Sequence, residues 1–153
     1  MQPHEWTTND FKGDPGIDYC HDKFLFAHSL HTLPERMIGA RMRFGMAIYC
    51  RQGTALITVD GLQYRLKQGQ MFSYQEGSLI EECLASSDAD LVLTGLSWEL
   101  IEATEALNTV VWSIVDYVRQ SPIYTLSEEA LSLTKIYHQQ IYKLCHSPNP
   151  LFR

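Results

Sequence analysis

The histidines and cysteines are the residues of this chain that could hold a metal ion, and their spacing argues against a site. Six histidines are present, but none occurs between His31 and His138, so the middle of the chain lacks the imidazole ligands that transition metals prefer. The four cysteines form no C-x-x-C pair and lie far apart, at Cys20, Cys50, Cys83 and Cys145. This spacing argues against a compact zinc knuckle or a dithiol redox motif. We therefore expect no metal and no cofactor, and we interpret the cysteines as small buried hydrophobic residues.

Motifs for nucleophilic catalysis are also missing. The chain has neither a G-x-S-x-G elbow nor a glycine-rich phosphate loop, so no catalytic residue is predicted. The adjacent carboxylates Glu81 and Glu82 are of interest, because neighbours on a strand face opposite sides and one of them must share an apolar face. A carboxylate in that position needs a cation, which Arg41, Arg43 or Arg65 could supply. Alternatively, the strand ends there and both glutamates reach water.

The two glutamates lead to a predicted binding site. Glu82 has the parity of Ile80 and Leu84, which should face the interior, so we interpret it as the group that orients a ligand. A small barrel has room for one such ligand. The strands that bound the predicted cavity bring polar groups at Arg41, Tyr64, Glu82 and Thr94.

The elements that must position these residues are mainly strands. Glycine recurs at every eighth position, at Gly45, Gly53, Gly61, Gly69 and Gly77. That spacing is typical of short strands joined by tight turns. Between Arg41 and Arg51 apolar and polar residues alternate, which is the period of a half-buried strand. Asp60-Gly61 favours a type I′ hairpin turn, since both central residues take positive φ.

The runs predicted as strands are 24–30, 41–51, 54–59, 62–66, 71–75, 79–84 and 91–96. Consecutive strands joined by short turns, with no helix between them, favour a sandwich or a barrel over a parallel sheet. We therefore predict a mainly β fold, an antiparallel barrel of about seven or eight strands followed by about three helices.

The helices follow residue 97. Residues 98–107 predict a short helix, residues 110–118 predict a second, and a third begins at Thr125 or Ser127 and runs to His146. The apolar stripe of the third helix, which needs one partner surface, is formed by Leu126, Ala130, Leu133, Tyr137, Ile141 and Leu144. Leu131 and Tyr142 lie on the opposite side and predict a homodimer interface. Alternatively, they are isolated exposed apolar residues of the kind that most protein surfaces carry.

Four segments result from this division. Residues 1–23 form an N-terminal arm, 24–97 the barrel, 98–146 a helical dimerisation segment, and 147–153 the start of a linker or a truncated next helix. The arm contains a tryptophan and a phenylalanine, so it could fold over the mouth of the barrel or, like many termini, be disordered.

Charge and hydropathy restrict the partners. Eighteen acidic and twelve basic residues give a net charge of −6, the wrong sign for a surface that follows a phosphate backbone. No segment approaches the ~20 apolar residues of a membrane span, and the N-terminus carries no apolar run of signal-peptide length. We expect a cytoplasmic protein that contacts neither nucleic acid nor a membrane directly.

The glycine spacing is similar to that of the cupins, small barrels that commonly hold a metal. Gly69 is followed by Phe72 at the place where metal-binding cupins carry the last histidine of their second motif. The block IYCRQGTALITVDGLQYRLKQGQMFSYQEGS followed by LVLTGLSWELIE resembles the N-terminal effector domain of AraC-type bacterial transcription regulators. The resemblance runs from about Phe24 to Leu144.

That resemblance implies a barrel that senses a small effector, helices that pair two subunits, and a separate helix-turn-helix domain, absent from this chain, that binds DNA. Sugar-sensing members use arginine, histidine and tryptophan on the barrel strands, whereas the late strands here carry Ile80-Glu81-Glu82 and Val92-Leu93-Thr94. This departure argues against a sugar effector, and it leaves open a member of the family that senses no ligand at all. The alternative is a free-standing, metal-independent cupin enzyme such as an isomerase or epimerase. It would need a histidine or tyrosine acid–base pair in the barrel, where the sequence offers Tyr49, Tyr64 and Tyr74.

Overall fold

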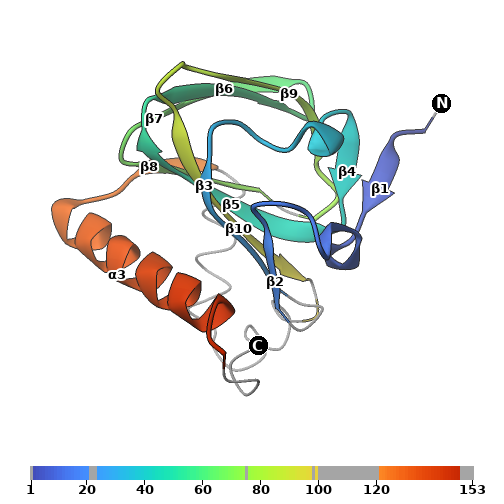
Figure 1. Cartoon of the computed structure of the whole chain (residues 1–153). Coiled ribbons are helices and arrows are strands. Elements are labelled where there is room, and N and C mark those ends of the chain that lie inside the picture. Colours follow the sequence, from blue (N-terminus) through green and yellow to red (C-terminus); the bar gives the residue numbers. More distant parts are fainter. Residues whose placement is uncertain (1, 21–23, 75, 98, 100–120, 149–153) are drawn as a thin grey trace.

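Two β-sheets form most of the structure (Figure 1). The computed structural model describes residues 2–20, 24–74, 76–97, 99 and 121–148. The strands of the five-stranded sheet are, in spatial order, β1 (His4–Trp6), β4 (Ala40–Met42), β9 (Leu79–Ala85), β6 (Thr54–Val59) and β7 (Leu62–Lys67). Those of the six-stranded sheet are β11 (Ile123–Thr125), β8 (Gln70–Tyr74), β5 (Phe44–Gln52), β10 (Asp90–Ser97), β3 (Phe24–Leu30) and β2 (Asp18–Cys20).

Pairing between these strands is antiparallel except between β1 and β4, which run parallel. Among the described residues, each strand pairs only within its own sheet. The mainly β fold is confirmed, whereas a closed barrel is not, since hydrogen-bonded pairing stops at the edges of the two sheets.

The alternation in the sequence correctly predicts the central strands. Along β5 the side chains of Phe44, Met46, Ile48 and Cys50 are buried and those between them are partly exposed. The predicted turn between β6 and β7 is confirmed as well. Asp60 has φ 50° and Gly61 has φ 81°, the positive values that a type I′ turn requires.

A continuous apolar core fills the space between the sheets. Its largest fully buried side chains are Phe11, Leu25, Met37, Met42, Phe44, Ile48, Ile57, Leu66, Phe72, Ile80 and Leu91. Burying side chains of this size stabilises the fold by roughly 1.5–3 kcal/mol for each.

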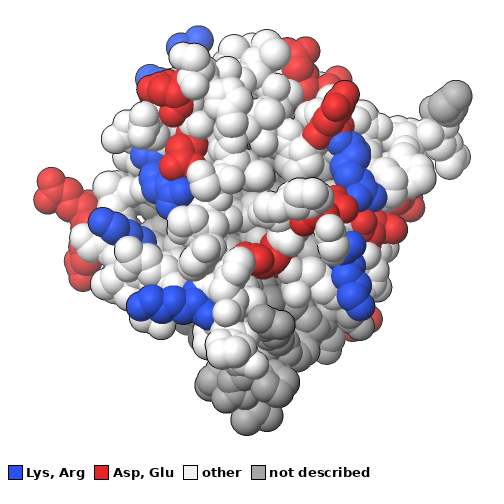
Figure 2. Space-filling view, in the orientation of Figure 1, with Lys and Arg blue, Asp and Glu red and all other residues white. Residues whose placement is uncertain are grey.

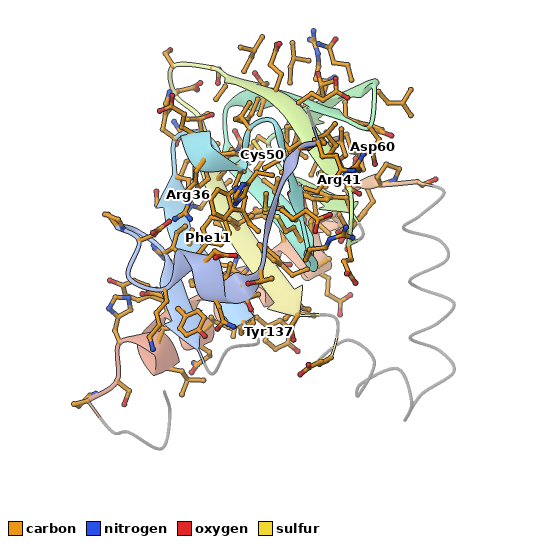
Figure 3. The ribbon with its side chains drawn as sticks, turned by 90° about the vertical axis from the view of Figure 1, so that its right-hand side faces the viewer. Phe11, Arg36, Arg41, Cys50, Asp60 and Tyr137 are labelled. Carbon is orange, nitrogen blue, oxygen red and sulfur yellow. The ribbon has the colours of Figure 1, made fainter. Side chains whose placement is uncertain are left out.

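The N-terminal segment contributes to that core. It contains a 3-10 helix, η1 (Thr8–Phe11), and a second one, η2 (Glu35–Met37), precedes β4. Phe11 is fully buried, with its ring centroid 5.9 Å from that of Phe44. The indole N–H of Trp6 donates to the carbonyl of Arg36 at 2.9 Å, and the Arg36 guanidinium lies 4.8 Å from the centre of the Phe11 ring (Figure 3). Residues 2–20 thus lie against the sheets, through strands of three residues that are too short to show a sequence period.

One α-helix, α3 (Glu128–Cys145), occurs among the described residues. It lies beside the outer face of the six-stranded sheet (Figure 1). Of the two starting points predicted, Ser127 is correct, because its side chain accepts the N–H of Ala130 at 3.2 Å. The predicted helices at 98–107 and 110–118 lie outside the described residues, apart from residue 99. Within the described part of the chain, no helix has the length and apolar character to span a membrane.

Candidate ligand-binding site

Arg41, the first residue of the predicted site, lies on the outer side of the five-stranded sheet. Its neighbours on β4, Ala40 and Met42, are both buried, so the Arg41 side chain points the other way. Its Nη1 donates to the carbonyl of Gly77 at 2.7 Å and lies 3.8 Å from Oδ1 of Asp60. Figure 3 shows Arg41 and Asp60 close together. Arg41 therefore joins the β8–β9 loop to the β6–β7 turn.

Glu82 is exposed, and its predicted inward orientation is wrong. The reason is a β-bulge in β9. Thr58 pairs with Glu82, but the next residue of β6, Val59, pairs with Ile80. Glu81 is therefore the extra residue of the bulge, and it shifts the alternation by one position.

The bulge gives Glu81 a structural role. Its Oε1 accepts the backbone N–H of Gly61 at 2.7 Å, which holds the β6–β7 turn against β9. Leu84, expected inside together with Glu82, is 55% exposed, while Cys83 packs against the core. The two adjacent carboxylates thus both lie at the surface.

Tyr64 and Thr94 lie on different sides of the sheets, Tyr64 toward the core and Thr94 on the outer face of the six-stranded sheet. Tyr64 packs on the core, with its ring centroid 5.1 Å from that of Phe72. Thr94 pairs with Ala47 and Phe26, and the Phe26 ring contacts His138 of α3 at 5.8 Å, so these three residues share the outer face. The four residues of the predicted site do not line one cavity, and their binding of an effector stays a prediction.

The space between the sheets contains apolar side chains where a ligand was expected. Phe72 is 1% exposed, and its ring centroid is 5.4 Å from that of Tyr74. The Tyr74 hydroxyl donates to Sδ of Met46 at 2.6 Å, and burial raises the Tyr74 pKa. No three His, Cys, Asp or Glu side chains of the described residues are grouped as metal ligands. This interior offers close packing rather than polar partners.

A pocket lies instead between the outer face of the six-stranded sheet and α3. We call it the helix–sheet pocket; its volume is about 480 Å³, within the usual range for a small-molecule site. It is lined by His28, Tyr49, Arg51, Leu131, Ser132, Lys135, His138 and Gln139. The first three belong to β3 and β5, and the others belong to α3.

Arg51 is fixed at the sheet side of the pocket. Its Nε donates to Oδ2 of Asp90 at 2.7 Å, and its Nη2 donates to Oδ1 of Asp90 at 3.2 Å and to the His28 carbonyl at 2.9 Å. Ser29 also donates to Asp90, at 2.6 Å. Burial raises the pKa of Asp90, but the hydrogen bonds from Arg51 and Ser29 outweigh it and leave the pKa below its ordinary value. Asp90 is therefore ionised at neutral pH and holds the guanidinium in place.

His138 and Tyr49 meet in the pocket, with ring centroids 5.7 Å apart. Burial, reinforced by the positive charge of Arg51, lowers the pKa of His138 to about 4. Burial also raises the pKa of Tyr49, although Arg51 partly opposes it. At neutral pH both side chains are uncharged and can donate or accept hydrogen bonds.

The apolar stripe of α3 is only partly covered, since Ala130 and Ile141 are half-buried whereas Leu133, Tyr137 and Leu144 are exposed. Leu131 lines the helix–sheet pocket, and the ring of Tyr142 lies 4.5 Å from His28 and 4.3 Å from His146. Both residues, predicted to form the dimer interface, thus lie on the sheet side of the helix, although Tyr142 is still 40% exposed. The other exposed apolar residues of α3 are Leu133 (45%), Ile136 (51%), Tyr137 (61%) and Leu144 (45%).

Two of the pocket residues were named from the sequence, but in other roles: Leu131 for the dimer interface, and Tyr49 as an acid–base candidate inside the barrel, whereas it lies on the outer face of β5. The remaining pocket residues were not predicted. One signal was present, since Leu131, Lys135, His138 and Tyr142 are spaced by four, three and four, which places them on one helix face. On β5, Tyr49 and Arg51 have the parity opposite to the buried residues, which places them together on the outer face.

No protein-family model and no curated protein matches this chain. Solved structures that are similar include the cupin domain of Cnp3 from Schizosaccharomyces pombe, at 16% identity and a TM-score of 0.37, covering 55% of this chain and 63% of that one. The EutQ protein of Clostridium difficile has 17% identity and a TM-score of 0.33, over 48% of this chain and 53% of that one.

KdgF from Halomonas sp. has 15% identity and a TM-score of 0.31, over 57% of this chain and 86% of that one. The match covers less than two thirds of the Cnp3 cupin domain and of the EutQ chain. Similarities of this size support no argument about function, so the site rests on the geometry described above.

Proposed function

We propose that this chain is a cytoplasmic sensing and dimerising module of an AraC-type transcription regulator, and that its effector binds in the helix–sheet pocket. The observation that carries the proposal is the position of the pocket between the six-stranded sheet and α3. A ligand there touches both β5 and the helix proposed to pair two subunits. Binding can thus change the position or stability of α3, as a sensor requires.

The α3 side chains that contact the sheet are partly exposed, which suits a movable element. Its C-cap residue His146 lies 3.0 Å from the Asp18 carboxylate of β2. Its middle contacts the sheet through the rings of His138 and Tyr142, and none of its residues is fully buried. A helix held in this way has a small free-energy difference between positions.

The exposed apolar face of α3, formed by Leu133, Ile136, Tyr137 and Leu144, is the surface we propose for a second copy of the chain. Symmetric dimers are the commonest assemblies. DNA contact is assigned to a separate helix-turn-helix domain. The net charge is −6, so direct DNA binding by this module is not expected. On the face drawn in Figure 2, acidic and basic side chains are interspersed.

A second candidate is a metal-independent enzyme, because His138 and Tyr49 form the histidine–tyrosine pair that an isomerase or epimerase would use. Their pKa values disfavour it. A general base works best with a pKa near the working pH, whereas the His138 pKa is about 4. The Tyr49 pKa is raised, which keeps the phenol protonated and makes it a poor base.

The test is a thermal-shift screen of small molecules followed by hydrogen exchange. We expect an effector to raise the melting temperature and to protect the backbone amides of α3, with Gln139→Ala weakening the response and Gln63→Ala, on the exposed side of β7, leaving it unchanged. Binding with no change in α3 protection would contradict the sensing role. Catalytic turnover of the bound compound would favour the enzyme. A reading frame that continues for about a hundred basic, helical residues, one domain's length, would favour the regulator.

A further inference from the structure

We infer that the helix–sheet pocket takes an organic acid with one carboxylate and an aromatic body. This inference rests on the proposed sensing function and specifies its ligand class. It is drawn from the charge and the shape of the pocket lining, which combines two cations, no carboxylate and an aromatic, partly apolar wall.

The cationic side of the pocket has hydrogen-bond donors that no described residue engages. Arg51 uses Nε and Nη2 for Asp90 and His28, which leaves Nη1 without a partner among the described residues. Lys135 is exposed, and no ion pair or hydrogen bond joins it to the described residues. Because Asp90 already balances Arg51, the lining keeps about one positive charge, which matches a monoanion.

The remaining lining favours an aromatic body. Tyr49 and His138 present ring faces, and Leu131 adds an aliphatic side chain. Both rings are uncharged at neutral pH, so they can stack on an aromatic system without a desolvated charge. A strongly hydrated dianion such as phosphate would leave this wall unused and would bring one negative charge too many.

The volume sets the size of the ligand. About 480 Å³ accommodates a bicyclic aromatic acid with some bound water, and it exceeds the needs of acetate or formate. We therefore choose 2-naphthoate as the probe and 2-naphthamide as its uncharged isostere. The two differ in charge and share the aromatic body.

The experiment measures the binding of both probes, and of inorganic phosphate, to the full 153-residue chain by calorimetry and thermal shift. The pocket variant is Lys135→Gln, and its matched control is Lys143→Gln, on the same helix but outside the pocket lining. Both lysines are exposed, so both variants should fold. We expect 2-naphthoate to bind at least tenfold more tightly than 2-naphthamide, and Lys135→Gln to remove about that tenfold, as for one charge-assisted hydrogen bond. Lys143→Gln should bind like the wild type.

The aromatic wall has its own variant. Tyr49→Ala should weaken both naphthyl probes by a similar factor of about three to ten, because a stacking contact of this kind does not depend on the ligand charge. Circular dichroism checks that Tyr49→Ala is folded. If it is not, the comparison of Lys135→Gln with Lys143→Gln still tests the inference.

Three results would overturn the ligand class. They are equal binding of 2-naphthoate and 2-naphthamide, phosphate binding as tight as that of 2-naphthoate, and no 2-naphthoate binding at millimolar concentration. If another compound from the screen binds and Gln139→Ala weakens it, the ligand class fails while the proposed sensing function stands. If no compound binds to the pocket, both fail.

Discussion

The two faces of the six-stranded sheet differ in what covers them. On the inner face Ile48, Phe72 and Leu93 are buried against the other sheet. On the outer face Tyr49 and Arg51 line an open pocket beneath α3. The same strands supply both faces, so the difference arises from the covering element. A second sheet closes the inner face with apolar side chains, whereas in the described part of the chain α3 covers the outer face and leaves space beneath it.

This difference indicates where the chain can respond to a ligand. A close-packed interior resists change because each substitution leaves a void or forces strain. A pocket bounded by one helix can open or close through movement of that helix. A sheet with one rigid face and one open face therefore combines stability with a site that can respond.

The largest expected effect tests the rigidity of the inner face. Phe72→Ala should lower the free energy of unfolding by about 3–5 kcal/mol, since it removes a buried ring and leaves a cavity. Met71→Ala, on the same strand but facing outward, should cost less than about 1.5 kcal/mol. Urea denaturation measures both. Equal losses would show that the two faces are packed equally well.

The pH dependence of stability tests the buried imidazole of the outer face. The pKa of His138 is about 4 in the folded chain, below the ordinary value of 6.5, so the unfolded state binds the proton more readily. Stability should therefore fall as the pH drops below about 6.5, and the loss should be complete below pH 4. Because the ring is partly exposed, we expect a loss of about 1–2 kcal/mol.

His138→Gln should remove this contribution between pH 7 and pH 4 in urea denaturation experiments. Ser132→Ala is the matched control, since Ser132 lies in the same pocket and has no group that titrates in this range. If the profile of His138→Gln follows that of the wild type, the ring is solvated and the pocket is more open than described.

A smaller effect is expected from the ion pair at the edge of the pocket. Arg51→Met should cost about 1 kcal/mol of unfolding free energy, because both side chains are about one third exposed and water screens the pair. The more exposed pair of Arg43 with Glu5 provides the control, and Arg43→Met should cost less. A double-mutant cycle with Asp90→Asn isolates the interaction. A coupling energy near zero would mean that Arg51 is free to reorient toward a ligand.

The sequence predicted the β-structure better than the orientation of individual residues. Alternation along β5 and the Asp60-Gly61 turn are local patterns, and the structure confirms both. Glu82 was misassigned because parity counting assumes a regular strand, and the bulge at Glu81 depends on pairing with β6, a partner about 20 residues away. Nothing within β9 itself marks the bulge.

The roles of the two helix faces could not be predicted for a different reason. The sequence shows two apolar faces on α3, a stripe that needs one partner surface and the side with Leu131 and Tyr142 that was predicted to pair two chains. In the structure the weaker face, with Leu131 and Tyr142, meets the sheet. Hydrophobicity alone cannot choose between two partner surfaces. The helix–sheet pocket could not be predicted from the sequence for a related reason, since only tertiary packing brings Arg51 and His138 together.

The smallest effect on stability is expected at the exposed face of α3, where a change in assembly should appear instead. Ile136→Asp replaces a side chain that is 51% exposed, so the fold should change by less than about 0.5 kcal/mol. If that face pairs two chains, the buried carboxylate should convert the dimer to a folded monomer. Leu131→Asp is the matched variant, and it should destabilise the fold because Leu131 faces the sheet. Sedimentation velocity measures assembly, and circular dichroism measures folding. A dimer that persists in Ile136→Asp but is lost in a folded Leu131→Asp would restore the interface predicted from the sequence.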